Sequence, residues 1–175
     1  MRHPESRLAR SPQPVAFAVV ASILSLPVLP EAPAVAADPG AFAALNGLWT
    51  GDGTVSRQDG TKTRIHCRAQ YVVTDNGTVL QQSLRCGSGA DEIHVNTHIN
   101  DRGGSLSGSW MEEPHNLSGT LSGKVIGDTL SINVAAGGAF SARMSVVTSG
   151  RSQSVEIKPN GIKVTDIKVS MSKAP

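Results

Sequence analysis

Cys67 and Cys86 are the residues whose chemistry this sequence predicts most directly. Their spacing is too long for the Cys-x-x-Cys pattern of redox-active thiols, so we expect a structural disulfide rather than a redox centre. The two cysteines lie symmetrically about a turn at 75–78, and the runs 63–74 and 79–86 on either side alternate apolar and polar residues. If these runs pair as an antiparallel hairpin, Cys67 lies opposite Cys86.

Two hairpin loops are compatible with this pairing: a two-residue loop of Asn76 and Gly77, and a four-residue loop over 75–78. We prefer the four-residue loop because it makes the cysteines a non-hydrogen-bonded pair, in which cross-strand side chains approach closest. A disulfide at this position implies an oxidising compartment.

The histidines and carboxylates do not form a catalytic or metal-binding pattern. His94 and His98 are four residues apart on a predicted strand, which places their Cα atoms about 13 Å apart, too far to share a metal ion. Glu112 and Glu113 are neighbours on a strand and point to opposite faces, with Glu112 on the inward face. The sequence also lacks a serine nucleophile elbow and a phosphate-binding glycine loop. We therefore expect no metal, no cofactor and no enzymatic activity.

The N-terminal segment 1–37 has the pattern of a signal peptide. Arginines precede an apolar run over 15–29, and the small residues at 34–37 offer a cleavage site. Proline interrupts the apolar run, which is too short to span a bilayer comfortably. We expect this segment to be removed, and the remaining 38–175 to form one domain that is periplasmic or secreted and has no membrane span.

The composition of that domain argues against a nucleic-acid surface. The signal segment holds three of the 16 Lys and Arg and two of the 14 Asp and Glu, which leaves 13 basic and 12 acidic residues and a net charge of +1. The domain has only five aromatic residues: Phe42, Trp49, Tyr71, Trp110 and Phe140. A nucleic-acid surface needs clustered basic residues and stacking aromatics.

From residue 47 onward the sequence alternates with period two, and turn residues interrupt it at intervals of roughly ten. We predict ten strands, over 47–57, 62–74, 78–87, 91–99, 105–112, 117–125, 128–135, 139–148, 152–158 and 162–172. Short connections make consecutive strands antiparallel neighbours, and closing this meander removes its exposed edges. The expected fold is all-β: a single antiparallel up-and-down barrel of about eight to ten strands. A short helical turn, with Asp38 as cap and Pro39 at its first position, precedes the barrel.

Two details of the alternation predict local irregularities. Along the last strand the phase changes at Thr165 and Asp166, which predicts a bulge that returns Ile167, Val169 and Met171 to the interior. Inward glycines on several strands leave room either for strand curvature or for a cavity, and we favour curvature.

Four residues on the predicted inner face are candidates for the barrel floor or for a wall that contacts ligand: Trp49, Tyr71, Gln82 and Trp110. In the cysteine hairpin register Tyr71 and Gln82 are cross-strand partners, and we interpret their contact as a buried hydrogen bond. We interpret the two tryptophans as floor and core. If Glu112 or Arg143 also reaches the interior, a cavity there is amphipathic.

Gly47, Leu48 and Trp49, directly after the helical turn, resemble the Gly-x-Trp signature of lipocalin-like barrels, and the pattern recurs at 108–110. More of the chain resembles a family of uncharacterised small secreted bacterial proteins. The matching stretches lie at 45–53, 65–71, 80–86, 106–112, 140–142 and 153–159. The resemblance implies a secreted lipocalin-like barrel, and it brings no assigned active site.

Two functions suit such a domain. The first is a non-catalytic binding protein that holds a small apolar or amphipathic ligand in the barrel. The second is an inhibitor of a secreted enzyme, such as a protease or lysozyme, that acts through loops at 87–90 and 100–104. A void with Tyr71 and Gln82 at its wall favours the first function, and an interior filled with side chains favours the second. In either case we expect a monomer.

Overall fold

Ten strands make up most of the described chain, which comprises residues 39–89, 92–138 and 140–175 of a computed structural model. The strands are β1 (Gly47–Arg57), β2 (Lys62–Thr74), β3 (Val79–Gly87), β4 (Glu92–Arg102), β5 (Ser105–Glu112), β6 (Leu117–Ile126), β7 (Thr129–Ala136), β8 (Phe140–Ser149), β9 (Ser152–Asn160) and β10 (Val164–Lys173). The predicted signal segment 1–37 lies outside the described residues. No helix in the described part is long and apolar enough to cross a membrane.

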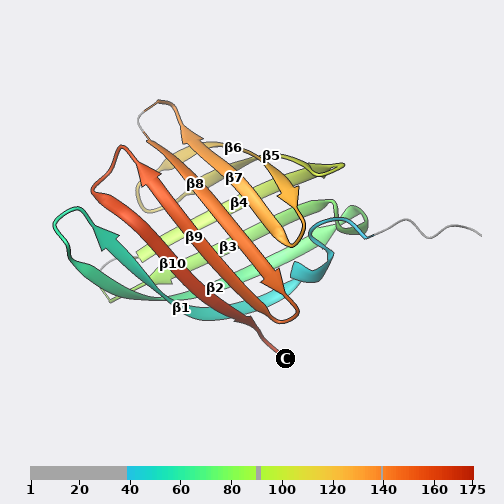
Figure 1. The fold of residues 1–175 in the computed structure, drawn as a ribbon, viewed down its shortest axis with the longest axis horizontal. Coiled ribbons are helices and arrows are strands. Elements are labelled where there is room, and N and C mark those ends of the chain that lie inside the picture. Colours follow the sequence, from blue (N-terminus) through green and yellow to red (C-terminus); the bar gives the residue numbers. More distant parts are fainter. Residues whose placement is uncertain (1–38, 90–91, 139) are drawn as a thin grey trace, which may run out of the picture. The chain divides into compact units, whose positions relative to one another are not determined.

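The strands form a single closed antiparallel barrel, which confirms the predicted fold class. Each strand pairs with the strands before and after it in sequence, and β1 closes the circle by pairing with β10, for example Gly53 opposite Val169. Figure 1 shows this seam, where the first and last strands lie side by side. Because the sheet is closed, no strand of the barrel presents an edge.

The β2–β3 hairpin has the register that the cysteines predict. Cys67 lies opposite Cys86, their Cα atoms are 4.1 Å apart, and the two sulfurs form a disulfide. The last pair before the turn is Thr74 and Val79, so the loop has four residues, as preferred. A short 3₁₀ turn, η2 (Asp75–Gly77), fills it, and all of its residues have positive φ. An intramolecular disulfide is typical of proteins from oxidising compartments.

The predicted bulge lies in β10. Ser56 pairs with Asp166 but the next residue, Arg57, pairs with Val164, so Thr165 is the extra residue. Val169 and Met171 beyond the bulge are buried in the interior, as the phase change predicts.

Inward glycines allow neighbouring strands to approach closely where the sheet curves. A Cβ at Gly119 would overlap the carbonyl oxygen of Ala135 on β7, and a Cβ at Gly108 would overlap that of His98 on β4. Both obstacles are backbone atoms, which cannot move aside without disturbing the sheet. Strand curvature, rather than space for a ligand, explains these glycines.

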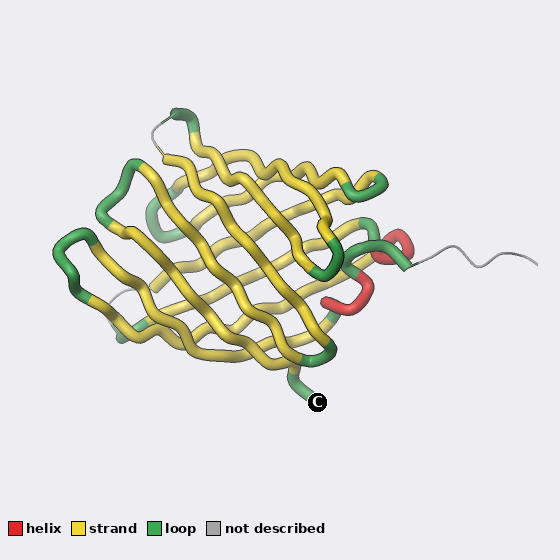
Figure 2. The backbone as a smooth tube through the Cα atoms, in the orientation of Figure 1, coloured by secondary structure: helices red, strands yellow, loops and turns green. Residues whose placement is uncertain are grey.

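The N-terminal segment closes one end of the barrel. Its helical turn is the 3₁₀ turn η1 (Ala43–Leu45), which begins later than expected, and Asp38, the predicted cap, lies outside the described residues. The backbone of Gly40 and Phe42 donates to carbonyl oxygens of the η2 turn. This seats Phe42 and Leu45, both buried, against the core. Figure 2 shows the two short turns, in red, next to each other at this end.

The connection between β4 and β5, at the same end of the barrel, is short. β4 continues to Arg102, so the predicted long loop at 100–104 is wrong: it is a turn formed by Gly103 and Gly104, both with positive φ. The pairing of β4 with β5 extends through Asn100 and Asp101, which are polar and therefore resemble a loop in the sequence.

Candidate functional site

The barrel encloses a cavity of about 430 Å³, and its lining is overwhelmingly apolar. At the end closed by η1 the lining residues are buried, and they include Leu45, Leu80 and Met171. At the opposite end they include Leu117 and Ile162, which are 47% and 43% exposed. The cavity therefore has a closed floor at the end of η1 and a mouth at the other end. Volumes of this size are typical of small-molecule sites.

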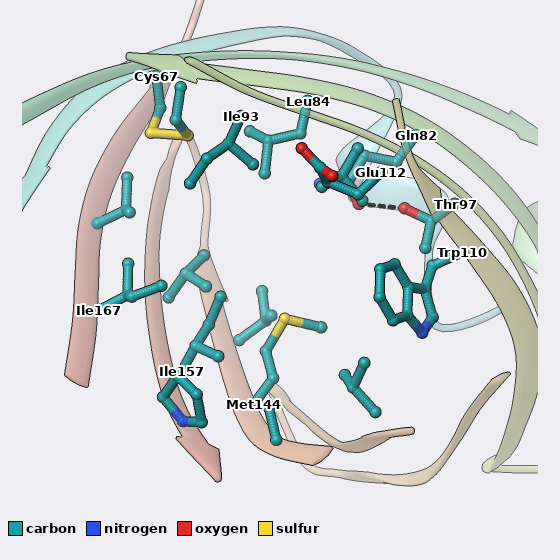
Figure 3. A pocket seen from close by; sticks show the side chains of 18 of the residues that line it. Cys67, Gln82, Leu84, Ile93, Thr97, Trp110, Glu112, Met144, Ile157 and Ile167 are labelled. Carbon is teal, nitrogen blue, oxygen red and sulfur yellow. Dashed lines mark hydrogen bonds between the residues drawn. A yellow bond between two sulfur atoms is a disulfide. The ribbon is translucent and has the colours of Figure 1, made fainter. Parts of the chain in front are cut away.

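Aliphatic side chains and the disulfide form most of the cavity wall. Cys67, Ile93 and Leu84 lie on one side, and Met144 and Ile157 on the other (Figure 3). Such a surface offers contact area to an apolar ligand, but it has no directional preference.

A chain of polar side chains crosses the wall near the floor. Thr97 donates to Gln82 Oε1 (2.6 Å), and Gln82 Nε2 donates to the hydroxyl of Tyr71 (3.3 Å). Tyr71 in turn donates to Gln153 Oε1 (2.9 Å), and Gln153 Nε2 donates to Thr148 Oγ1 (3.3 Å). These bonds satisfy the polar groups that the barrel buries among apolar residues.

Tyr71 is the central member of this chain. It is only 4% exposed, and burial raises the pKa of its phenol to about 12, although the hydrogen bonds with Gln153 and Gln82 act in the opposite direction. The phenol is therefore neutral at physiological pH and both donates and accepts a hydrogen bond.

The two tryptophans occupy different places. Trp49 is fully buried beneath the cavity, where its Nε1 donates to the carbonyl oxygen of Leu45 (2.7 Å) and its ring meets Tyr71 edge to face. Trp110 lines the cavity and packs edge to face on Phe140. Its Nε1 reaches across β6 to the carbonyl oxygen of Ala135 on β7 (3.3 Å). Trp49 thus belongs to the floor. Trp110 belongs to the wall (Figure 3).

Charged side chains line the cavity at its mouth. Glu112, at the end of β5, points inward and its side chain is 8% exposed. It accepts a hydrogen bond from the backbone N–H of His115 (2.9 Å), and the imidazole Nδ1 of His115 lies 3.1 Å from both carboxylate oxygens. Arg57, at the end of β1, donates to Thr63 Oγ1 (2.7 Å). Arg143 is exposed on the outer face and does not reach the interior.

One histidine on the outer face stands between a serine and a carboxylate. His94 Nδ1 lies 2.7 Å from Glu113 Oε2, and its Nε2 lies 3.4 Å from Ser83 Oγ. At Ser83 the strand is paired on both sides, with Gln70 and Asn96, so its backbone N–H groups are used within the sheet. No pair of backbone donors is left there to stabilise an oxyanion, and we assign this arrangement no reaction.

The other histidines lie apart. His66 Nδ1 is 3.2 Å from Asp52 Oδ1 on the outer face, and His98 is exposed. No group of three or more potential metal ligands occurs among the described residues.

Sequence reasoning missed Thr97 and Gln153 as site residues. Thr97 lies between Val95 and Ile99 on the inward positions of β4, and Gln153 shares the parity of Val155 on β9. Strict alternation was the signal that could have identified both, because it assigns a polar residue to the interior as readily as an apolar one.

The fold and cavity place the chain among ten-stranded antiparallel barrels with a hollow, apolar interior. The crystal structure of Rv2717c from M. tuberculosis is similar, with a TM-score of 0.60 and 14% sequence identity, and the match covers 77% of this chain and 96% of that chain. At this identity the likeness shows the barrel fold alone. No protein-family model and no curated protein sequence matches the chain.

Proposed function

We propose that the protein is a non-catalytic binding protein that holds a small apolar or amphipathic ligand inside the barrel. The observation that carries the proposal is the cavity of about 430 Å³ with Tyr71 and Gln82 at its wall. A protein that only presented loops to an enzyme would have no use for a hollow interior, because filling it with side chains would stabilise the barrel. The cavity therefore favours ligand binding over enzyme inhibition.

The proposal extends to where the protein works. The disulfide and the expected signal segment 1–37 together support a periplasmic or secreted protein. The resemblance of Gly47, Leu48 and Trp49 to the lipocalin-like signature agrees with a carrier of small apolar molecules, acting as a monomer.

A substitution that fills the cavity tests the proposal. Ala142 on β8 is buried and lines the cavity, whereas its neighbour Ser141 is exposed on the outer face. We expect Ala142→Phe to weaken binding of the neutral dye N-phenyl-1-naphthylamine about tenfold or more, since the ring occupies the ligand's volume. Ser141→Phe adds the same side chain on the outer face and should leave binding unchanged. Dye fluorescence measures the affinity, and thermal unfolding verifies that both variants fold.

A second measurement looks for the natural ligand. Protein exported by its own host and examined by native mass spectrometry should carry a small molecule. A folded protein that is empty in that measurement and binds neither the dye nor any lipid would refute the proposed function.

A further inference from the structure

We propose that the ligand of this cavity is an amphipathic amine, whose protonated nitrogen is bound by Glu112 while its apolar part fills the barrel. This inference rests on the proposed function and specifies the class of ligand. It starts from one observation: a carboxylate with an exposed fraction of 8% lies on an otherwise apolar wall. Burying such a group is costly unless hydrogen bonds and an opposite charge compensate it.

The surroundings of Glu112 are mainly aliphatic. Across the sheet it faces Val95 on β4 and Leu117 on β6, and both of these side chains line the cavity. Figure 3 shows Glu112 on the same wall as Leu84 and Gln82. The contacts with His115 in the β5–β6 turn are a structural use of this carboxylate. A leucine or methionine at the same position would nevertheless bury apolar surface at no electrostatic cost.

The protein partners of Glu112 leave part of its capacity unused. The two groups that contact its oxygens, a backbone N–H and an imidazole, both belong to His115, whose side chain is 69% exposed at the mouth. A carboxylate accepts about four hydrogen bonds, two at each oxygen. The contacts with His115 hold the carboxylate in place from the solvent side, and the remaining lone pairs are available to a group inside the cavity.

The charges at the mouth favour a cation at Glu112 over an anion. Arg57 also lines the cavity and carries a charge opposite to that of Glu112. It lies at the end of β1, separated from β5 by three strands, and it is hydrogen-bonded to Thr63. A ligand ammonium next to Glu112 supplies up to three donors and a full positive charge. A ligand carboxylate in the same place would meet a like charge in surroundings of low dielectric constant.

The ligand also needs an apolar part that fits the rest of the cavity. Beyond Glu112 the wall offers aliphatic side chains such as Ile93 and Met144, and the polar chain of Tyr71 near the floor already pairs its members with one another. An alkyl or aromatic amine with one cationic end satisfies both regions, whereas a ligand with a second charge would bury it without a partner at the floor.

Three probes that share one tail test this assignment: decylamine, decan-1-ol and decanoate. Affinities for the protein are measured at neutral pH by displacement of N-phenyl-1-naphthylamine. We expect decylamine to bind about tenfold more tightly than decan-1-ol, and decanoate to bind more weakly than both. In Glu112→Gln, which keeps the shape of the side chain, the amine should lose this advantage and bind about as well as the alcohol.

Glu113→Gln provides the matched control. Glu113 is the next residue in the chain, but it lies on the outer face in contact with His94 and Asn96, so the amine preference should persist in this variant. Equal affinities of wild-type protein for decylamine and decan-1-ol, or an amine preference that survives Glu112→Gln, would overturn the inference while leaving ligand binding intact. If neither the dye nor any of the three probes binds to the folded wild-type protein, and the exported protein is empty, the proposed function fails as well.

Discussion

At the scale of single residues, the interior differs from an ordinary core in a few polar side chains. Tyr71 donates to Gln153 and accepts from Gln82, and Glu112 keeps a carboxylate among aliphatic neighbours. The phenol and the two amides form a satisfied group, which stabilises one arrangement of the wall. Glu112 is different, because its protein partners lie on the solvent side only. The polar chain around Tyr71 therefore shapes the cavity, and we propose that Glu112 selects the ligand.

Titration of Tyr71 gives a test at this scale, because it is the only tyrosine in the chain. Its pKa is raised from 10.0 to about 12 by burial, so the folded state favours the neutral phenol. The resulting stabilisation is complete below pH 10 and is lost as the pH rises from 10 to 12, by about 2–3 kcal/mol. We expect the ultraviolet absorbance of the phenolate to appear near pH 12 in folded protein and near pH 10 in urea-unfolded protein.

The comparison with Tyr71→Phe isolates this contribution from those of the other ionisable groups. Over this pH interval the unfolding free energy of wild-type protein should fall more steeply than that of the variant. Parallel pH profiles for the two proteins, or a phenol that titrates near its ordinary value in the folded state, would contradict the buried placement of Tyr71.

At the scale of elements, alternation was sufficient to locate all ten strands, because period two is a local property of each segment. The bulge at Thr165 could also be predicted, because the phase of the apolar–polar alternation changes there. The full length of β4 could not be predicted, since polar residues at a strand end resemble a loop in the sequence. The hydrogen bond between Tyr71 and Gln153 could not be predicted either. It joins β2 to β9 across the closure of the barrel, between residues that are 82 positions apart in the sequence.

Gly119 on β6 offers a test of how strands approach one another. It lies opposite Trp110, and the absence of a side chain lets the indole cross β6 to reach the carbonyl oxygen of Ala135. We expect Gly119→Ala to lower the unfolding free energy by about 1–3 kcal/mol, because the methyl group overlaps both the indole and a backbone oxygen. The midpoint of urea unfolding measures the loss, and tryptophan fluorescence should shift as the Trp110 ring moves. The control is Ser118→Ala, which changes the adjacent outward residue and should have little effect.

At the scale of the whole molecule, the cavity is the property that no single segment of sequence specifies. Its volume depends on the number of strands and on their tilt and stagger around the barrel. The inward glycines do not indicate the cavity, since they accommodate close strand contacts, as favoured from the sequence. What the sequence did allow was a conditional statement: a void with Tyr71 and Gln82 at its wall favours ligand binding. The structure meets that condition, with aliphatic side chains that line the barrel without filling it.

Closure of the barrel also determines how the molecule should unfold. Every strand pairs with two neighbours, and β10 joins the last part of the chain to the first through its ladder with β1. Loss of any one strand therefore breaks two ladders. Loss of β10 also releases the floor, because the Nζ of Lys173 on β10 donates to the carbonyl oxygen of Ala44 in η1. We expect a single cooperative transition in urea.

Two probes, one that reports only the floor and one that reports the whole sheet, can test this cooperativity. In Trp110→Phe the only tryptophan left is Trp49, so fluorescence reports the floor alone, while far-ultraviolet circular dichroism reports all strands. The two transitions should coincide within error, because the floor cannot open while the β1–β10 seam remains paired. A floor transition at lower urea than the loss of strand signal would mean that η1 and Trp49 detach from an intact barrel, and closure would then not couple the floor to the sheet.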